Sequence, residues 1–250
     1  MPARKKLDRI AQIIQILQLT RGAGIKELAR KLAVSEMTVR RDLEDLAREN
    51  VVKIIHAGAV LSAGAHEGAP VMTEEKMRIG RKAASLIDPG DIVIVDSGST
   101  TEWLARSIPQ DSRITVICFS LNVLVEARQR RGCILVFAGG TLQEKTLTFE
   151  SPEGIELLRR SRAHKAFLSA AGVSGTLGVT CGSSGEAEMK RAALGSSLSR
   201  ILLVDSRKFG LVSPAWFADM KSFDAIVSDT GISLEYVEIA RGLGISLHLV

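Results

Sequence analysis

The 250-residue sequence is poor in aromatic residues and cysteine, and it contains no long apolar run. Aromatic residues make up 4% of the chain, so the 46% of hydrophobic residues must build the core from Ala, Val, Ile and Leu, as is common in α/β proteins. Cys118, Cys133 and Cys181 form no closely spaced pair, which argues against a disulfide framework and against a zinc site. No stretch approaches 18 apolar residues, and the first ten residues do not resemble a secretory signal. We expect a cytoplasmic protein with reduced cysteines, no bound metal and no cofactor.

The positive charge of the chain is concentrated at its N-terminus. The net charge is +5, and residues 1–60 hold 12 Lys and Arg against 7 Asp and Glu, while the remaining residues are balanced. This asymmetry predicts a basic N-terminal module that contacts a polyanion such as nucleic acid. A basic face that only contacts solvent is the alternative that charge leaves open.

Apolar spacing predicts three helices in this module. Residues 7–19 place one apolar stripe at helical spacing, and residues 25–32 repeat the pattern in a shorter helix. A tight turn at residues 33–35 leads into a third helix at residues 36–48, with Ser35 as its N-cap. Two short helices, a turn and a capped basic helix together favour a helix-turn-helix.

The third helix has an apolar face and an opposite face suited to reading DNA. Val39, Leu43 and Leu46 fall within about 60° of one another at 100° per residue, so they form the buried face. The side chains on or beside the outward face are Met37, Thr38, Arg40 and Arg41. Arg binds guanine or phosphate, Thr binds bases or phosphates, and Met contacts a thymine methyl group. An ordinary solvent-exposed helix is the alternative.

The segment after this helix predicts a β-wing. Residues 51–60 favour two short strands, from which Lys53 and His56 could reach the DNA backbone or minor groove. Residues 34–46 resemble the VSxxT(I/V)RRDLxxL pattern of DeoR-type bacterial repressors, and residues 56–59 are similar to the HGGA of their wing, with Ala57 replacing the first glycine. The expected DNA-binding residues are Ser35, Met37, Thr38, Arg40, Arg41, Lys53 and His56.

Composition places a domain boundary before residue 73. The predicted winged helix-turn-helix spans residues 1–62, and residues 63–72 form a linker rich in small residues. Residues 73–250 form an effector and oligomerisation domain, whose first helix starts at a Thr73 cap and ends at Pro89–Gly90. Short apolar strands then alternate with helices or turns, which predicts an α/β fold with a largely parallel sheet. The expected strands are residues 92–95, 114–118, 133–137, 166–170, 201–204, 225–228 and 245–249.

Polar and glycine residues follow four of these strands. In open α/β sheets, ligands bind at the carboxyl ends of the strands. Residues 96–101 (DSGSTT) lead into a helix expected near Glu102, where backbone N–H groups and hydroxyls suit an anion. The other clusters contain Ser120 and Asn122, Gly139 and Gly140, and Asp205 with Lys208. Lys208 could supply positive charge to a phosphate, and Asp205 could hold a hydroxyl or orient Lys208.

These clusters also resemble the DeoR-type effector domain, as do residues 169–173 (SAAGV) and 185–191 (GEAEMKR). The resemblance implies a fold related to ribose-5-phosphate isomerase and a phosphorylated sugar as ligand. Residues 118–122, 169–173, 180–181 and 205–210 favour deoxyribose-5-phosphate within the family. The expected ligand-binding residues are Asp96, Ser97, Gly98, Ser99, Thr100, Thr101, Ser120, Asn122, Gly139, Gly140, Gly172, Glu186, Asp205 and Lys208.

Two alternatives to a DNA-binding sugar-phosphate sensor stay open. The first is a sugar-phosphate isomerase fused to a DNA-binding module, because Asp96, Glu186, Asp205 and Lys208 are candidate acid–base groups. However, residues 170–173 lack the aspartates that the isomerases carry in the matching loop, so we expect no catalytic residues. The second is a purely structural C-terminal domain, against which the four polar clusters argue. The regulator is expected to form a homo-oligomer on double-stranded operator DNA, away from membranes.

Overall fold

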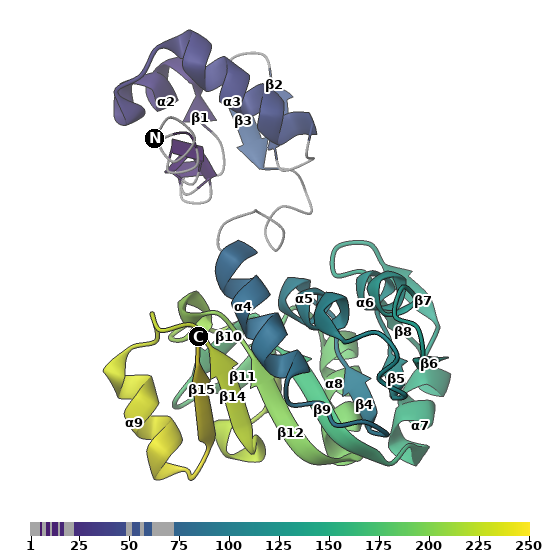
Figure 1. Ribbon diagram of the computed structural model, residues 1–250. Coiled ribbons are helices and arrows are strands. Elements are labelled where there is room, and N and C mark those ends of the chain that lie inside the picture. Colours follow the sequence, from purple (N-terminus) through teal and green to yellow (C-terminus); the bar gives the residue numbers. More distant parts are fainter. Residues whose placement is uncertain are drawn as a thin grey trace. The chain divides into compact units, whose positions relative to one another are not determined.

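The computed structural model describes residues 6, 9–10, 12–14, 16–17, 23–48, 52–55, 58–61 and 73–250. The chain divides into two compact units, Met1–Val71 and Met72–Val250 (Figure 1), and each is described by itself. The expected linker at residues 63–72 lies outside the described residues. No helix among the described residues is long and apolar enough to cross a membrane.

The first unit is a helix-turn-helix with a small antiparallel sheet. The described residues between 6 and 17 are helical. They are followed by β1 (Ala23–Gly24), α2 (Ile25–Leu32), α3 (Glu36–Arg48), β2 (Val52–Ile55) and β3 (Gly58–Leu61), with the strands in the order β1-β3-β2. The predicted second and third helices and the two wing strands are confirmed. The two-residue strand β1 was not predicted, because residues 21–24 carry no apolar alternation.

Apolar stripes on the helices build the core of this unit. Val39, Leu43 and Leu46 of α3 are at most 1% exposed, as their spacing predicts. They share a cluster with Ile13, Ile14, Leu17, Leu28 and Val52, among other residues. Gly58 lets β3 approach β1 closely, because a Cβ there would lie 2.1 Å from the carbonyl oxygen of Ala23. The turn between α2 and α3 places Ala33 in the left-handed region, with φ of 51°.

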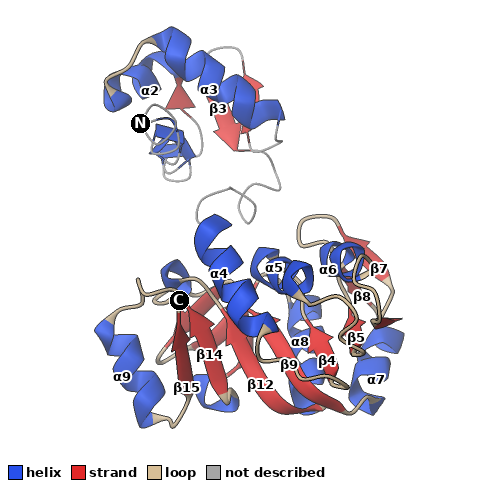
Figure 2. Ribbon diagram, viewed as in Figure 1, coloured by secondary structure: helices blue, strands red, loops and turns tan. Residues whose placement is uncertain are grey.

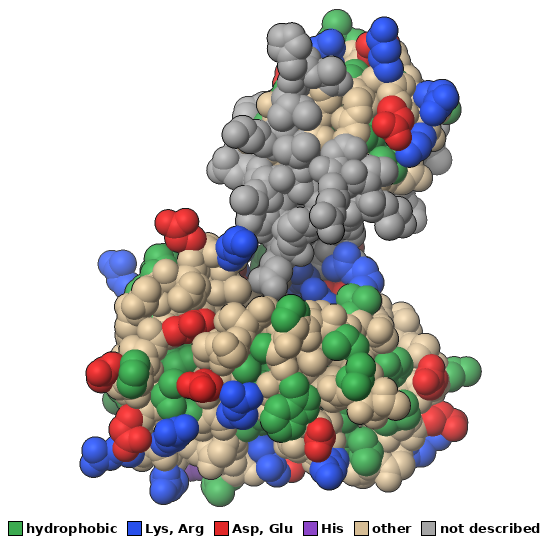
Figure 3. Space-filling view, turned by 180° about the vertical axis from the view of Figure 1, so that it is seen from behind, with side chains coloured by type: hydrophobic (Ala, Val, Ile, Leu, Met, Phe, Trp, Pro, Cys, Tyr) green, Lys and Arg blue, Asp and Glu red, His purple; other side chains and the backbone are tan. Residues whose placement is uncertain are grey.

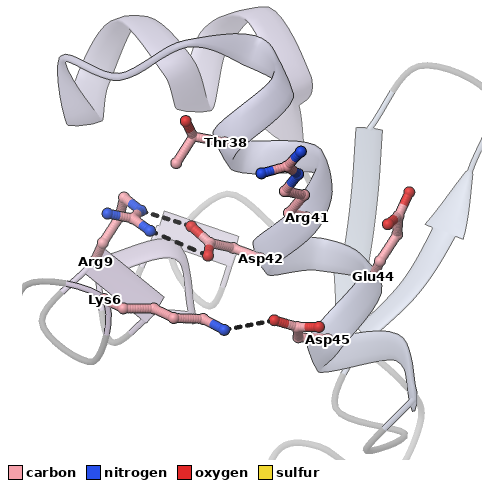
Figure 4. Close-up of a pocket in the computed structure, with 7 residues that line it drawn as sticks. All are labelled: Lys6, Arg9, Thr38, Arg41, Asp42, Glu44 and Asp45. Carbon is pink, nitrogen blue, oxygen red and sulfur yellow. Dashed lines mark hydrogen bonds and ion pairs between the residues drawn. The ribbon is translucent and has the colours of Figure 1, made fainter. Parts of the chain in front are cut away.

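The ion pair between Arg9 and Asp42 joins the N-terminal helical segment to α3. Arg9 donates to both carboxylate oxygens of Asp42, at 2.6 and 3.2 Å, and the Asp42 side chain is 3% exposed (Figure 4). One turn along, Lys6 lies 2.6 Å from Asp45, but both partners are far more exposed. A bidentate pair with a buried carboxylate has one favourable geometry, so it fixes how α3 is held.

The second unit is built on a seven-stranded parallel sheet, so the predicted fold class is confirmed. The sheet order is β15-β14-β12-β9-β4-β5-β6, and every neighbouring pair is parallel. All seven strands were expected within a few residues of their observed bounds. They are β4 (Ile92–Val95), β5 (Thr115–Cys118), β6 (Ile134–Phe137), β9 (Ala163–Ser169), β12 (Ser197–Leu203), β14 (Ala225–Ser228) and β15 (Ser246–Leu249).

Helices cover both faces of this sheet (Figure 2). One face packs against α4 (Thr73–Ala84), α5 (Ser99–Ser107) and α6 (Leu121–Ala127), which share a cluster with Val93, Val95 and Val116. The other face packs against α7 (Pro152–Arg160), α8 (Ser184–Gly195) and α9 (Leu234–Gly242). Burial on both faces explains why a central strand such as β4 (IVIV) is apolar without alternation, whereas the edge strand β15 (SLHL) carries polar residues.

Two antiparallel sheets were not predicted. One is the hairpin of β7 (Thr141–Gln143) and β8 (Thr148–Glu150). The other contains β10 (Gly172–Ser174), β11 (Gly178–Cys181) and β13 (Ala215–Ala218), in the order β10-β11-β13. These strands are only three or four residues long, and apart from β13 (AWFA) they mix polar and apolar residues, so no sustained apolar run marks them.

Two helix bounds differ from the predictions. The helix α4 ends at Ala84 rather than at Pro89–Gly90, because Leu86 and Ile87 donate to carbonyls three residues back and tighten its end. The helix α5 begins at Ser99 rather than near Glu102. Gly98 has φ of 119°, so the chain turns from β4 directly into the helix, and the Gly98 carbonyl accepts from Glu102 N.

We predict that Arg9→Met destabilises α3 locally by about 2 kcal/mol. The loss is smaller than for a fully enclosed pair, because Arg9 keeps contact with solvent, but Asp42 is left buried without its partner. Native-state hydrogen exchange of the α3 amides measures this loss. Lys6→Met, which removes an exposed pair, should change the same amides by well under about 1 kcal/mol. Equal effects of the two substitutions would contradict this role for Arg9.

Candidate functional site

The outward face of α3 carries the side chains that were predicted to read DNA. Met37 is 61% exposed, and Arg40 and Arg41 are also exposed. Within the part of the chain that the structure describes, neither arginine forms an ion pair, so both guanidinium groups are available to bases or phosphates. Figure 4 shows Arg41 and Thr38 on the same side of α3.

Ser35 acts as the predicted cap rather than as a free contact. Its Oγ accepts from Thr38 N at 3.2 Å and lies 2.8 Å from the Thr38 hydroxyl. This satisfies a backbone donor at the start of α3 and leaves the Ser35 side chain at the exposed end of the helix. Lys53 lies in β2 as expected, and His56 lies outside the described residues.

The strand order marks one edge of the sheet in the second unit as the candidate ligand site. Chain order runs outward from β4 through β5 to β6 on one side, and from β9 through β12 to β14 and β15 on the other. The reversal between β4 and β9 is a topological switch point, where loops at the carboxyl ends diverge and leave a crevice. Residues 96–101 follow β4 and residues 170–171 follow β9, so both loops flank this point.

The loop at residues 96–101 has the backbone of an anion site. It joins β4 to the N-terminus of α5, where unpaired N–H groups carry partial positive charge. A Cβ on Gly98 would lie 3.0 Å from Ser169 Oγ, so the glycine permits close packing of the loops after β4 and β9. Lys76 of α4 donates to Ser99 Oγ at 2.7 Å, which brings a cation to the start of α5.

A buried lysine lies beneath this loop. Lys190 of α8 is 0% exposed and donates to Asp96 Oδ2, while its Nζ lies 3.1 Å from Glu186 Oε1. Asp96 is also fully buried and accepts from Ser169 N at 2.8 Å. The Ser169 hydroxyl in turn donates to the carbonyl of Ser97 at 2.7 Å. Lys190 therefore ties α8 to the carboxyl ends of both strands at the switch point.

The two carboxylates keep Lys190 charged. Burial alone lowers the pKa of a lysine, but the charges of Asp96 and Glu186 outweigh it and raise the pKa of Lys190 above its usual value. Glu186 is held by a second contact, since its Oε2 accepts from Gly182 N at 3.0 Å. Burial raises the pKa of Asp96 despite the positive charge of Lys190, and the three side chains form a buried cluster that positions the loops after β4 and β9.

Two further predicted residues lie beside the anion loop. Asn122 Nδ2 donates to the carbonyl of Gly98 at 3.1 Å and to Glu102 Oε2 at 3.2 Å. Ser120 follows β5, the neighbour of β4, and is fully buried. The structure thus brings Ser120 and Asn122 together with residues 96–101, as the shared sheet edge predicts.

Three other predicted ligand residues, all glycines, make contacts within the protein. Gly139 accepts from Ser151 Oγ at 2.9 Å, and a Cβ on Gly140 would lie 2.5 Å from the carbonyl oxygen of Glu150. A Cβ on Gly172 would lie 2.5 Å from the carbonyl oxygen of Leu211. Gly140 and Gly172 therefore require glycine for close backbone approach, whereas a Cβ on Gly139 would meet nothing closer than the Phe137 ring at 3.8 Å.

The loop after β12 contains a buried aspartate that contacts two of the basic residues after it. Asp205 is 1% exposed, its carboxylate pairs with Arg207 at 3.1 Å, and its backbone carbonyl accepts from Lys208 N at 3.0 Å. Lys208 is partly exposed at the same sheet edge. Because β12 is two strands from β4, this loop lies about 10 Å along the edge from residues 96–101.

Sequence reasoning missed Lys190, Lys76 and Asp229. Lys190 had a signal, because it lies four residues after Glu186 on a helix whose neighbouring residues Ala187, Met189 and Ala193 are apolar and buried. Asp229 follows β14 and accepts from Ser206 N at 2.7 Å, holding the loop after β12. Lys76 lies among other charged residues of α4, so no pattern separates it from a solvated lysine. No cluster of metal-ligating side chains occurs in the described ranges.

Comparison with known proteins identifies both units. Residues 9–63 match the DeoR-like helix-turn-helix domain, and residues 71–230 match the DeoR C terminal sensor domain. The chain belongs to the DeoR family. As a member, it is a DNA-binding transcriptional regulator with a sensor domain, which confirms the resemblance seen in its motifs.

Relatives in this family match almost the whole chain. The deoxyribose operon repressor of Escherichia coli (strain K12) is 32% identical over 247 residues, covering 97% of this chain and 98% of that protein. The lactose phosphotransferase system repressor of Staphylococcus epidermidis (strain ATCC 12228 / FDA PCI 1200) is 31% identical over 234 residues, covering 90% and 92%. Among solved structures, ribose 5-phosphate isomerase A from Methanocaldococcus jannaschii is similar at 19% identity and a TM-score of 0.39, covering 54% of this chain and 53% of that one.

We predict that Lys190→Met destabilises the sensor unit by about 3–5 kcal/mol at pH 7, because it leaves two buried carboxylates without their cation. The loss should shrink toward pH 5, since a buried carboxylate can avoid the cost by taking up a proton. Urea unfolding at the two pH values measures both effects. Lys221→Met serves as control, because its pair with Asp219 is exposed and should contribute less than about 1 kcal/mol. A loss that is small, or independent of pH, would contradict the proposed ion-pair cluster.

Proposed function

We propose that this protein represses a sugar or deoxyribonucleoside catabolic operon and leaves its operator when a phosphorylated sugar binds the sensor domain. The observation that carries the proposal is that one chain combines a helix bearing two exposed arginines, Arg40 and Arg41, with an anion loop at a sheet switch point. The motifs shared with DeoR-type repressors support deoxyribose-5-phosphate as the effector. So does the similarity to the deoxyribose operon repressor of Escherichia coli.

The phosphate of the effector is held by the loop at residues 96–101 in this proposal. The N–H groups at the start of α5 and the hydroxyls of Ser97 and Ser99 supply hydrogen bonds, and Lys76 supplies positive charge next to Ser99. Lys190 does not neutralise the phosphate, because its charge is already matched by Asp96 and Glu186. Lys208 approaches from the neighbouring loop after β12.

A sensor explains this site better than an isomerase does. An isomerase needs an acid and a base that can exchange protons with the substrate. Asp96 and Glu186 are both paired with buried Lys190, and Asp205 is paired with Arg207. Three of the four candidate groups are therefore held in ion pairs, and Lys208 alone does not make an acid–base pair. We infer that the protein is a regulator without enzymatic activity, acting in the cytoplasm.

Operator binding requires more than one copy of the chain. A single helix-turn-helix reads only a few base pairs, so such regulators pair two modules on a near-palindromic site. The sensor unit leaves apolar side chains exposed over one face (Figure 3), and Leu177, Leu211, Val212 and Trp216 are each at least 49% exposed. Exposed apolar surface of this kind supports a homo-oligomer formed through the sensor domain.

Arg41→Ala should weaken binding to the operator by about 1–3 kcal/mol, because it removes a base or phosphate contact from the exposed face of α3. Fluorescence anisotropy with a DNA site selected by the protein from a random library measures the loss. Lys31→Ala on α2 also removes one positive charge, and it should weaken binding to selected and to random DNA to similar extents. Unchanged affinity of Arg41→Ala for the selected site would show that Arg41 is not one of the residues that contact operator DNA.

A thermal-shift titration with sugar phosphates tests the sensor. Deoxyribose-5-phosphate at 100 times its dissociation constant should stabilise the protein by about 2.7 kcal/mol, while free deoxyribose should not. Lys208→Ala should reduce this shift and leave operator affinity intact. If no phosphorylated sugar in a broad panel shifts the transition, the proposed effector site is wrong, although the DNA-binding assignment stands.

A further inference from the structure

The segment after β5 meets the β7–β8 hairpin directly beside the anion loop. Leu121 N donates to the carbonyl of Leu147 at 2.8 Å, and Ser120 and Thr148 form an isolated antiparallel bridge. Asn122 joins the same segment to the carbonyl of Gly98. Figure 1 shows β7 and β8 beside α6, so the hairpin covers the carboxyl end of β5.

Unsatisfied polar atoms are concentrated in this corner. Among the described residues, six buried side-chain nitrogen or oxygen atoms have no hydrogen-bond partner, and three of them are Ser120 Oγ, Asn122 Oδ1 and Thr146 Oγ1. Buried polar atoms in native proteins are nearly always paired, because leaving one unpaired costs free energy. Three such atoms around one contact indicate that a partner is supplied from outside the chain.

None of these three atoms forms a hydrogen bond within its own loop or helix. Ser120 is the residue before α6, yet its hydroxyl makes no capping hydrogen bond. Asn122 bonds through Nδ2 alone, to Gly98 and Glu102, and leaves its carbonyl oxygen free. The fold is satisfied without Ser120 Oγ, Asn122 Oδ1 and Thr146 Oγ1, so a role in binding explains them better than a role in folding.

We propose that Ser120, Asn122 and Thr146 form the subsite that reads the sugar hydroxyls of the effector, next to the loop that holds its phosphate. The proposal rests on the proposed function and extends the site to the β7–β8 hairpin. Asn122 Oδ1 can only accept, so its partner must donate, as a sugar hydroxyl does and a phosphate dianion does not. The Ser120 and Thr146 hydroxyls can donate or accept, which suits adjacent hydroxyls on a sugar chain.

The hairpin must lift to admit the ligand, because the three atoms are buried. A two-stranded hairpin is marginally stable by itself, and residues 141–145 are exposed. Leu147, whose carbonyl contacts Leu121, has φ of 54°, a conformation that costs energy for a residue other than glycine. The hydrogen bond from Leu121 N to Leu147, which holds the hairpin against the segment after β5, is therefore made at a strained residue. Thr146, next to Leu147, would close onto the bound sugar.

Thr146→Val and Ser120→Ala test the subsite, because each removes a hydroxyl while nearly keeping side-chain shape. Each variant should bind deoxyribose-5-phosphate or ribose-5-phosphate about five- to tenfold more weakly by calorimetry, for loss of one hydrogen bond. Affinity for inorganic phosphate should stay unchanged. The melting temperature of the ligand-free protein should stay the same or rise, since an unsatisfied buried hydroxyl is removed. Thr115→Val, at the amino end of β5, is the matched control and should alter no affinity.

Three outcomes would overturn the subsite in distinguishable ways. Wild-type sugar-phosphate affinity in both variants refutes the subsite and leaves the proposed function intact. A fall in inorganic phosphate affinity or in melting temperature that matches the loss of sugar-phosphate affinity shows a structural role for the hydroxyls. A wild-type protein that binds neither inorganic phosphate nor any phosphorylated sugar of the broad panel refutes the proposed effector site, and the subsite with it.

Discussion

The contact on which the sensor site depends is the buried pair of Lys190 and Asp96. A lysine with no exposed surface is tolerated only because two carboxylates surround it, and that arrangement permits one geometry. Through Asp96 and Ser169 it sets the distance between the loops after β4 and β9, where the sheet reverses direction. One ammonium faces two carboxylates in this cluster, so Lys190 has no positive charge to spare for an anion. In the proposed site the attraction for an anion comes instead from the backbone at the start of α5 and from Lys76. Positioning and binding are thereby assigned to different residues.

The DNA-binding unit also uses different residues for positioning and for binding. Arg9 and Asp42 fix how α3 is held, while Arg40 and Arg41 of the same helix are exposed and can contact DNA. Regulation then requires that the effector bind the DNA-competent and DNA-released arrangements with different affinity, since equal affinity would shift nothing. A hairpin that changes position when sugar binds offers one physical source of such a difference.

The sequence predicts the framework of both units well and the contacts of the sensor site only in part. Periodicity places α2, α3 and the seven parallel strands because each buries an apolar face that local residues encode. Loops that follow parallel strands meet at the carboxyl edge of the sheet, which correctly predicts that Ser120 and Asn122 lie beside residues 96–101. Sequence reasoning does not find that Asp96 pairs with Lys190, 94 residues away, or that Asp205 turns to Arg207. Such pairings depend on which of several charged side chains the fold brings together. Sequence reasoning also misses the β7–β8 hairpin, because strands of three residues show too little alternation of polar and apolar residues to be recognised.

In the proposed function, one chain couples an anion site at the sheet edge to sequence-specific DNA binding. This coupling is measured as the affinity of the protein for its selected DNA site, by anisotropy at fixed ionic strength with increasing deoxyribose-5-phosphate or another phosphorylated sugar. One phosphorylated sugar should weaken operator binding at least about fivefold, the lower end of typical coupling energies, while its unphosphorylated form has no effect. Operator affinity that stays constant while the same sugar phosphate demonstrably binds would contradict the coupling.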